Sequence, residues 1–413
     1  MDVTENTLLT IAGLALLAMV FGDIYSTILR SSEYSGLFSN AINRNLWRLG
    51  LIITRKLSRR QRHRILASLG PLLMPIYIAC LVSMLITGFA LIYIPRIATE
   101  FKIVEPVYES AISQGFYFSG VTFLTIGYGD ILPVSGFTRF FALIEGASGI
   151  AIISLSITYL ITVYGALERR RTVALIFYHQ ARQGADISGF IVSHFARGNF
   201  HSLTPSLHEA TRNLDEMLES HLEYSIIHFF HSREVYKGLP RIIFIVFEAV
   251  AILNSMLDEA SYVEAGDHPD VLIAGDSARY VLAELLTKLN LEACANEAFE
   301  PENRTLLRHR YCFNRASRRL QKVGIKLRSD LDQAFEEYSA DRNLWEKQLY
   351  HLSNFLGYDW EEVTGDRNLE DATDDEVTER HEMLTADKSD APDKIGEAKL
   401  EKNEAEEELS ENI

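Results

Sequence analysis

The sequence predicts an all-α membrane protein in which transmembrane helices are followed by a helical cytosolic domain. Three apolar stretches are each long enough to cross a bilayer, which takes about 20 apolar residues: Leu8–Leu29, Leu72–Ile94 and Phe140–Tyr164. After the third stretch the chain becomes polar, yet its apolar residues keep a helical spacing. Residues 359–413 hold 21 Asp and Glu but only 6 Lys and Arg, so this end carries −15 of the net charge of −16.

The first stretch is predicted to be a retained N-terminal transmembrane helix within residues 1–30. Asp2 and Glu5 precede it, whereas a cleavable signal peptide begins with basic residues. The linker that follows, 31–71, has eight basic residues: Arg44, Arg48, Arg55, Lys56, Arg59, Arg60, Arg62 and Arg64. The positive-inside rule puts this linker and the C-terminus in the cytoplasm and the N-terminus outside. Asp23, near the inner end of the helix, is expected to cap a helix or to reach the membrane interface.

Residues 37–57 are amphipathic, with arginines between apolar positions. Trp47 beside arginines suits the headgroup zone, so the segment is predicted to be a helix lying on the inner leaflet. The alternative is an ordinary cytosolic linker helix. We expect anionic lipids to bind the basic segment 44–64. The compact three-span layout suggests the inner (plasma) membrane of a prokaryote.

Between the second and third stretches, residues 122–130 read T-F-L-T-I-G-Y-G-D. Rings of backbone carbonyl oxygens can replace the water shell of a cation. These carbonyls face one axis only if successive residues alternate between ordinary and left-handed backbone conformations. Gly127 and Gly129 can take the left-handed positions without a Cβ penalty. Pro106 suits the first turn of a short helix, which is predicted over Val107–Phe123 and leads into this loop.

This nonapeptide resembles the selectivity filter of the potassium-channel family with a two-helix pore domain, whose pattern is T-x-x-T-[VI]-G-Y-G-D. The resemblance covers about residues 72–165. It implies K⁺ sites at Thr125, Ile126, Gly127 and Tyr128, with Asp130 concentrating cations at the outer mouth. It also implies a homotetramer, because one chain supplies one of four filter strands.

The same resemblance implies that Tyr117, Phe118 and Thr122 brace the filter. Many family members have a carboxylate just before the first Thr of the motif, where this chain has Val121. A carboxyl link between pore helix and filter mouth is therefore predicted to be missing. No cofactor is expected; K⁺ is the permeant ion.

The third stretch contains two glycines, Gly146 and Gly149. Gly149 falls where similar pores have a hinge in the inner helix; the alternative is close helix packing through small residues. Ile153, Ile157 and Ile161 lie four apart, so they share a face that is expected to line the inner cavity and to close it by dewetting.

Glu145 is an ionisable group inside the same stretch, and such groups are expensive in a membrane. It is expected behind the filter, protonated or hydrogen-bonded to pore-helix groups. The alternative, a purely structural hydrogen bond, stays open.

Residues 166–358 are predicted to form a helical regulatory domain entered directly from the third span. Helices are expected from Thr204, as N-cap, with Pro205 in the first turn, and at 270–290, 304–327 and 329–356. Ile242–Leu257 is strongly apolar but short and carries Glu248 and Asn254, so it is predicted to be a buried helix of this domain.

Four histidines fall in one region of this domain together with two glutamates: His208, His221, His228, His231, Glu219 and Glu223. They could sense protons or bind a metal; the alternative is a set of solvated or core histidines.

Several function classes lack support in the sequence. There is no G-x-G-x-x-G after a strand, no arginine-rich voltage sensor and no hydrolase, kinase or redox motif, so we expect neither an enzyme nor a nucleic-acid partner. Cys80, Cys294 and Cys312 imply no disulfide framework. Residues 366–413, acidic and nearly free of aromatic residues, are predicted to be disordered.

The expected function is a K⁺-selective, homotetrameric channel gated by its cytosolic domain. One alternative is a less selective monovalent cation channel, against which Tyr128 argues. Another is a subunit of a potassium uptake system, although such proteins carry four degenerate filter segments and this chain has one complete copy. A third is a receptor with a vestigial pore, which an intact filter disfavours.

Overall fold

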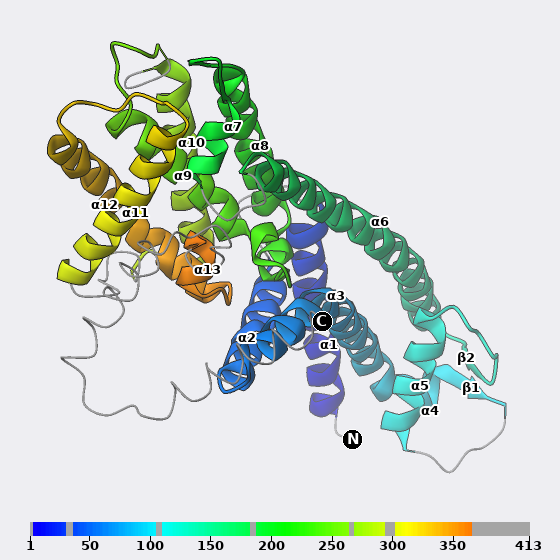
Figure 1. Cartoon of the computed structure of the whole chain (residues 1–413). Coiled ribbons are helices and arrows are strands. Elements are labelled where there is room, and N and C mark those ends of the chain that lie inside the picture. Colours follow the sequence, from blue (N-terminus) through cyan, green and yellow to red (C-terminus); the bar gives the residue numbers. More distant parts are fainter. Residues whose placement is uncertain are drawn as a thin grey trace, which may run out of the picture.

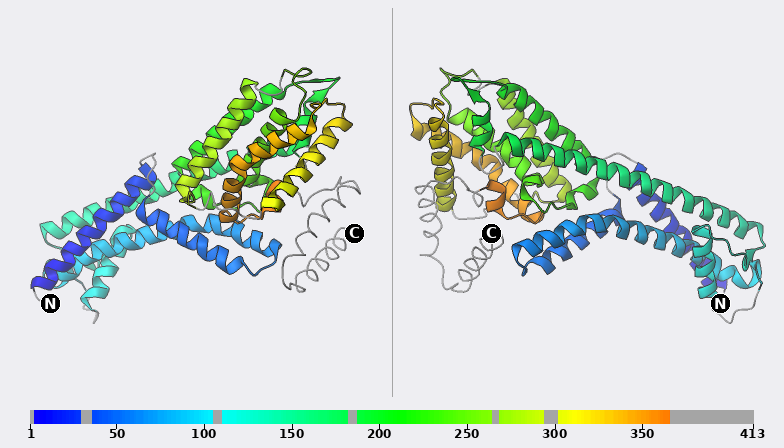
Figure 2. Two further views of the ribbon diagram at one scale, coloured as in Figure 1. Left: turned by 90° about the vertical axis from the view of Figure 1, so that its left-hand side faces the viewer. Right: turned by 45° about the vertical axis from the view of Figure 1, so that its right-hand side comes forward.

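The computed structural model describes residues 3–29, 36–104, 110–181, 187–263, 268–293 and 302–365. It has the predicted fold class. Three of its helices are long and apolar enough to cross a membrane, by length and composition. These helices converge at one end of an elongated molecule, and a helical C-terminal domain occupies the other end (Figures 1 and 2).

Helix α1, Val3–Ile24, continues as the π-helical η1, Tyr25–Leu29, and packs along α3, Arg59–Tyr93. Glycines allow the two backbones to approach closely. A Cβ atom on Gly13 would lie 2.6 Å from the Gly88 carbonyl oxygen. Such small-residue crossings are common between membrane helices, because dispersion contacts rather than water exclusion hold them together.

Asp23 has the predicted capping role, but it caps a different helix. Its carboxylate accepts a hydrogen bond from the backbone N–H of Phe38, at 2.8 Å, near the start of α2, Leu37–Thr54. Its other oxygen accepts from the Tyr77 hydroxyl of α3, at 2.9 Å. Asp23 thus joins three helices at the end of α1.

A short helix, α5 (Ala111–Phe123), lies between α3 and the long α6 (Gly136–Gln180). It starts later than predicted: Ser110 is its N-cap and accepts from the Ser113 N–H, while Pro106 lies outside the described residues. The connection from α3 consists of η2 (Ile94–Arg96), α4 (Ile97–Glu100) and β1 (Phe101–Ile103). Strand β2, Ile131–Pro133, pairs antiparallel with β1, which closes the two ends of the α5 region against each other.

Helix α6 runs 45 residues without a break, from beside α5 into the C-terminal domain (Figure 1). The prediction that the third span continues directly into the next domain is confirmed. Because no flexible linker intervenes, a movement of the C-terminal domain can be transmitted through α6 to the region beside α5.

The C-terminal domain packs its helices around α9, Leu239–Ser255, nearly all of whose side chains are buried. The prediction of a buried helix rather than a fourth span is confirmed. The other elements are α7 (Ser188–Ser193), β3 (Phe195–Ala196), β4 (Asn199–Phe200), α8 (Leu203–Glu223), η3 (Ser225–Phe229), η4 (Val235–Lys237), α10 (Pro269–Leu289), α11 (Glu302–Lys322), α12 (Leu331–Phe355) and α13 (Trp360–Thr364). The N-cap of α8 is Ser202, two residues before the predicted Thr204.

Glu248, the charge that argued against a fourth span, is neutralised inside the domain. Arg342 of α12 lies 3.4 Å from the Glu248 carboxylate and 2.6 Å from that of Glu346. All three side chains are buried. Buried charges persist only when they are paired in this way, so this network fixes the register of α12 on α9.

The interfacial position predicted for Trp47 is wrong. Its side chain is fully buried, and its indole N–H donates to the Phe355 carbonyl oxygen of α12 at 2.8 Å. One face of helix α2 therefore packs on the C-terminal domain, while a position of the helix on the inner leaflet stays a prediction. An indole suits a buried hydrogen bond as well as a headgroup zone, so the sequence could not separate the two.

The predicted acidic tail begins later than residue 359. Asp359 and Glu362 form a reciprocal capping box that starts α13, and Trp360 and Val363 are buried. The folded domain therefore extends at least to Gly365. The rest of the predicted tail, 366–413, lies outside the described residues.

Candidate functional site

The loop of residues 124–130 connects α5 to β2 and has an unusual backbone. Thr125, Gly127 and Gly129 have positive φ angles of 55°, 62° and 80°. Ile126, Tyr128 and Asp130 between and after them do not. The alternation predicted for a carbonyl-lined strand is therefore present, and Thr125 adds a third left-handed residue. A non-glycine residue in this conformation is strained, so the surroundings must hold it.

The start of the loop is fixed to α5 by backbone hydrogen bonds. Thr125 N–H donates to the Thr122 carbonyl at 3.0 Å, and Ile126 N–H donates to the Val121 carbonyl at 2.9 Å. Thr122, a predicted brace, thus acts through its backbone. These bonds continue the end of α5 into the loop and set the direction in which the strand leaves the helix.

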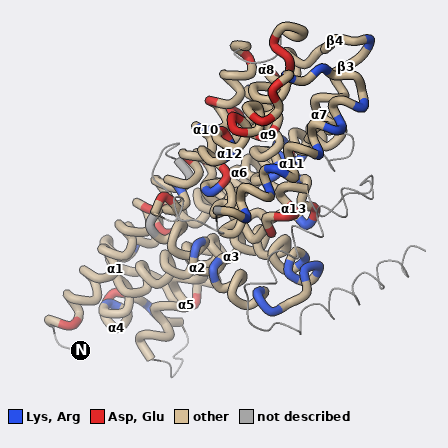
Figure 3. The backbone as a smooth tube through the Cα atoms, turned by 60° about the vertical axis from the view of Figure 1, so that its left-hand side comes forward, with Lys and Arg blue, Asp and Glu red and all other residues tan. Residues whose placement is uncertain are grey.

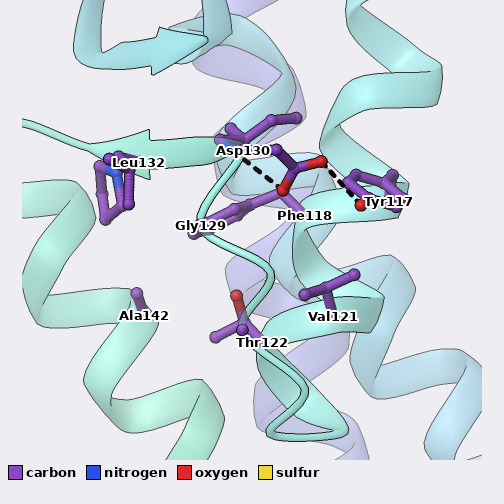
Figure 4. A pocket seen from close by; sticks show the side chains of 11 residues that line it. Tyr117, Phe118, Val121, Thr122, Gly129, Asp130, Leu132 and Ala142 are labelled. Carbon is purple, nitrogen blue, oxygen red and sulfur yellow. Dashed lines mark hydrogen bonds between the residues drawn. The ribbon is translucent and has the colours of Figure 1, made fainter. Parts of the chain in front are cut away.

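The outer end of the loop is held by Asp130. The Tyr117 hydroxyl of α5 donates to the Asp130 carboxylate at 2.7 Å (Figure 4), and Val104 N–H donates to the Asp130 carbonyl at 2.9 Å. Val121 offers no carboxyl link, as predicted, but Tyr117 one turn earlier supplies a hydroxyl link instead. Tyr117 was predicted to brace the loop, but its hydrogen bond to Asp130 was not predicted.

Phe118 braces the loop from behind through an aromatic cluster. Its ring meets those of Tyr93 and Phe101 edge to face, with centroids 5.1 and 4.9 Å away. Edge-to-face packing is the favoured geometry for such rings. The cluster anchors α5 to α3 and β1.

A cavity of about 220 Å³ lies beside the loop (Figure 4). Its lining includes Tyr117, Thr122, Gly129, Leu132 and Ala142. On the loop itself, Ile126 and Tyr128 are 49% and 69% exposed. These two side chains therefore project away from the rest of the chain.

Gly149 is a contact point of α6 on α5. A Cβ atom there would collide with the Phe123 carbonyl oxygen, whereas one on Gly146 would meet only the Thr122 carbonyl oxygen, at 3.8 Å. Helix α6 continues through Gly149 without a break. The geometry supports the close-packing alternative; a hinge at this position stays a prediction.

The three isoleucines predicted to line a cavity share an exposed face of α6. Ile153, Ile157 and Ile161 are all exposed, while Ile152, Tyr159 and Val163 on the other side are buried. The helix thus has an inner packed face and a free apolar face along the same length.

Glu145 lies at the meeting point of three helices and is fully buried. The Tyr93 hydroxyl of α3 contacts its Oε2 at 2.8 Å, and the Ser119 hydroxyl of α5 contacts its Oε1. The expected hydrogen bond to α5 is therefore present through Ser119, and Tyr93 adds one to α3.

The predicted histidine cluster divides into two groups. His221 and His228 face each other, with their Nδ1 atoms 2.9 Å apart. His231 instead contacts His63 of α3, Nε2 to Nδ1 at 2.7 Å. His208, Glu219 and Glu223 are exposed. Within the described residues no three His, Cys, Asp or Glu side chains are arranged to hold a metal.

Burial keeps these histidines neutral. Burial, together with nearby positive charge, lowers the pKa of His228 and of His231 to about 3. The pKa of His221 is also well below its usual value, by burial and by His228. The core-histidine alternative is the one that the geometry supports.

Residues 224–232, here termed the junction segment, lie between α3 and α6 where both leave the membrane part. The buried Arg170 of α6 donates to the Phe230 carbonyl at 2.7 Å. On α3, a Cβ atom at Gly70 would lie 2.9 Å from the Phe229 carbonyl oxygen.

His63 extends this contact to the end of the domain, because its Nε2 lies 3.2 Å from Glu362 of α13. No local sequence pattern indicates the junction, because residues that contact each other in it are 57 to 299 positions apart.

Comparison with known proteins agrees with this layout. A family described as ion channels matches residues 77–165, which span the C-terminal half of α3, all of α5, the loop and the first part of α6. An uncharacterised membrane protein of Bacillus subtilis (strain 168), YdjJ, is 28% identical over 251 residues, which cover 60% of this chain and 70% of that protein. No solved structure matches. Residues 77–165 thus resemble an ion-channel domain by sequence as well as by their helical layout.

The two glycines of α6 provide a matched test of packing. Alanine favours a helix over glycine by about 1 kcal/mol, so Gly146→Ala should stabilise the protein or leave it unchanged. Gly149→Ala should destabilise it, because the methyl group collides with the Phe123 carbonyl. Thermal unfolding of both variants in detergent measures the difference. If Gly149→Ala is as stable as Gly146→Ala, the contact is absent in solution.

Acid should destabilise the C-terminal domain. Between about pH 6.5 and pH 3 the unfolded chain binds protons at histidines that stay neutral when folded, so the free energy of unfolding falls as the pH falls, by about 1.4 kcal/mol per pH unit for each such histidine. Fluorescence of Trp47, Trp345 and Trp360, all buried, reports unfolding of this region. The midpoint of unfolding should drop as the pH is lowered from 7 to 5. The drop should be smaller in a His221→Leu/His228→Leu variant. A pH-independent midpoint would contradict the neutral assignment.

Proposed function

We propose that this protein is a potassium-selective ion channel that conducts passively as a homotetramer. The observation that carries the proposal is the loop of residues 124–130, in which Thr125, Gly127 and Gly129 alternate with residues of ordinary φ. Such a backbone turns successive carbonyls to one side, where they can replace the hydration shell of K⁺. The sequence of the loop, T-I-G-Y-G-D, supports K⁺ as the ion.

The proposal takes four chains around one axis, as in the potassium-channel filter that this loop resembles. A single loop supplies oxygens from one direction only, and closed rotational symmetry completes the ring. The exposed Ile126 and Tyr128, and the free face of Ile153, Ile157 and Ile161, are the surfaces that a tetramer would bury or turn to a central cavity. Hydrophobic rings of this kind can close a pore by dewetting.

Gating by the C-terminal domain is the third part of the proposal. Helix α6 is continuous from Gly136, just after β2, to Gln180, and the junction segment lies between it and α3. A shift of the domain would therefore change the distance between the two pore helices below the filter. An effector acts on such an equilibrium only if it binds the two arrangements unequally.

In this proposal the protein lies in the plasma membrane with its N-terminus outside and its C-terminal domain in the cytoplasm. Lys and Arg gather at the turn between α2 and α3 (Figure 3), next to the exposed Leu49, Ile52 and Ile53. Apolar groups beside basic ones suit the surface of an anionic leaflet. Arg59 and Arg62 are already engaged with Glu362 and Asp359, so the lipid-binding set is smaller than the basic segment 44–64.

Two alternatives are weaker. A less selective cation channel is disfavoured by the intact filter sequence. A potassium uptake subunit is disfavoured because the chain has one filter segment and such systems use four.

The filter backbone can be tested with Gly129→Ala. Within the described part of its own chain nothing lies within 4 Å of a Cβ at this position, so there the substitution acts through its cost in a left-handed conformation, about 1–2 kcal/mol per chain. K⁺ efflux from proteoliposomes should be lost. Gly120→Ala in α5 is the control, since its site is equally open and helical. Normal K⁺ efflux through Gly129→Ala would contradict the assigned conducting loop.

The junction can be tested with Arg170→Gln. Hydrogen bonds from a buried charged donor contribute about 1.5–3 kcal/mol each, so losing the contact to Phe230 should shift the open–closed equilibrium of single channels tenfold or more. Arg169→Gln, at an exposed position of the same helix, should leave open probability unchanged. Size-exclusion profiles verify that both variants are assembled. Equal open probability in the two would make the domain a scaffold.

A further inference from the structure

The carboxyl group of Glu145 is surrounded by neutral groups. It lies on α6 and meets Tyr93 of α3 and Ser119 of α5. Its side chain is fully buried, and no Lys, Arg or His among the described residues pairs with it. A charged carboxylate without a counter-charge is costly in a protein interior and more so within a membrane.

A count of hydrogens decides its protonation. The Ser119 hydroxyl has one hydrogen, but its oxygen contacts two acceptors, the Ile86 carbonyl at 2.9 Å and Glu145 Oε1. The Tyr93 hydrogen is used on Oε2. With an ionised carboxylate, one Ser119 contact would bring two lone pairs together with no hydrogen between them. With a proton on Oε1, Glu145 donates to Ser119 and Ser119 donates to Ile86, so every contact has its hydrogen.

We propose that Glu145 is a protonated, uncharged carboxylic acid that positions the pore helix α5. It ties Ser119 to α6 one turn from the point where Gly149 contacts the Phe123 carbonyl. Two contacts a turn apart fix the tilt of α5 against α6, and Tyr93 extends the link to α3. Because α5 leads directly into the loop of residues 124–130, its tilt sets where the carbonyl oxygens lie. This inference rests on the proposed channel function for its consequence, but not for the proton itself.

Glu145→Gln separates a neutral role from a charged one. The amide can donate to Ser119 and accept from Tyr93 in the same shape. Single-channel K⁺ conductance and the K⁺/Na⁺ permeability ratio should stay within about twofold of the unmodified protein, since no hydrogen bond is lost. Glu145→Ala, in channels that still assemble, should lower the permeability ratio about tenfold or more, because both hydrogen bonds are lost. Glu168→Gln, at an exposed position of α6, is the control.

Infrared spectroscopy of the purified protein tests the proton without any conduction assay. The difference spectrum between the unmodified protein and Glu145→Gln should show loss of a carboxylic-acid C=O band. Loss of carboxylate bands instead would overturn the proposal, as would assembled Glu145→Ala channels with unchanged K⁺/Na⁺ discrimination. If the acid band is lost but neither protein conducts K⁺, the proposed function fails while the proton assignment stands.

Discussion

A strand whose carbonyl groups all point one way cannot satisfy them with its own amides, so its shape has to be imposed by what surrounds it. The loop of residues 124–130 has the backbone alternation that such a strand requires, with three left-handed residues at every second position. Left-handed conformations outside glycine carry a cost, and Thr125 bears it. Helices α3, α5 and α6, together with β1, supply the contacts that hold this loop in place.

The loop is held at both ends and from behind. Its start continues the hydrogen bonding of α5, and its end is tied by Asp130 to Tyr117 and Val104. Behind it, Glu145 and the aromatic cluster around Phe118 connect α5 to both long helices. The same long helices also contact the junction segment, so the loop and the C-terminal domain are connected through two shared helices. That shared construction is why we propose gating by the domain.

The sequence predicted the features that depend on local pattern. Apolar length located α1, α3 and α6, glycine spacing located the loop, and charge inside Ile242–Leu257 identified α9 as a soluble-domain helix. It failed where a residue suits two environments equally. Trp47 fits a headgroup zone or a buried hydrogen bond, and only its tertiary partner Phe355 decides. The junction was invisible because Arg170, His63 and Glu362 come together only after the whole chain has folded. For Gly149 the sequence left two roles open, a hinge and a close helix contact, and the proximity to the Phe123 carbonyl supports the close contact.

The most direct test of the account is the reversal potential of the purified protein in planar bilayers with K⁺ on one side and Na⁺ on the other. A filter of aligned carbonyls sized for a dehydrated K⁺ predicts a current that reverses close to the K⁺ equilibrium potential and follows it as the K⁺ concentration is changed. A reversal potential near zero, with K⁺ and Na⁺ carrying equal current, would contradict the central claim.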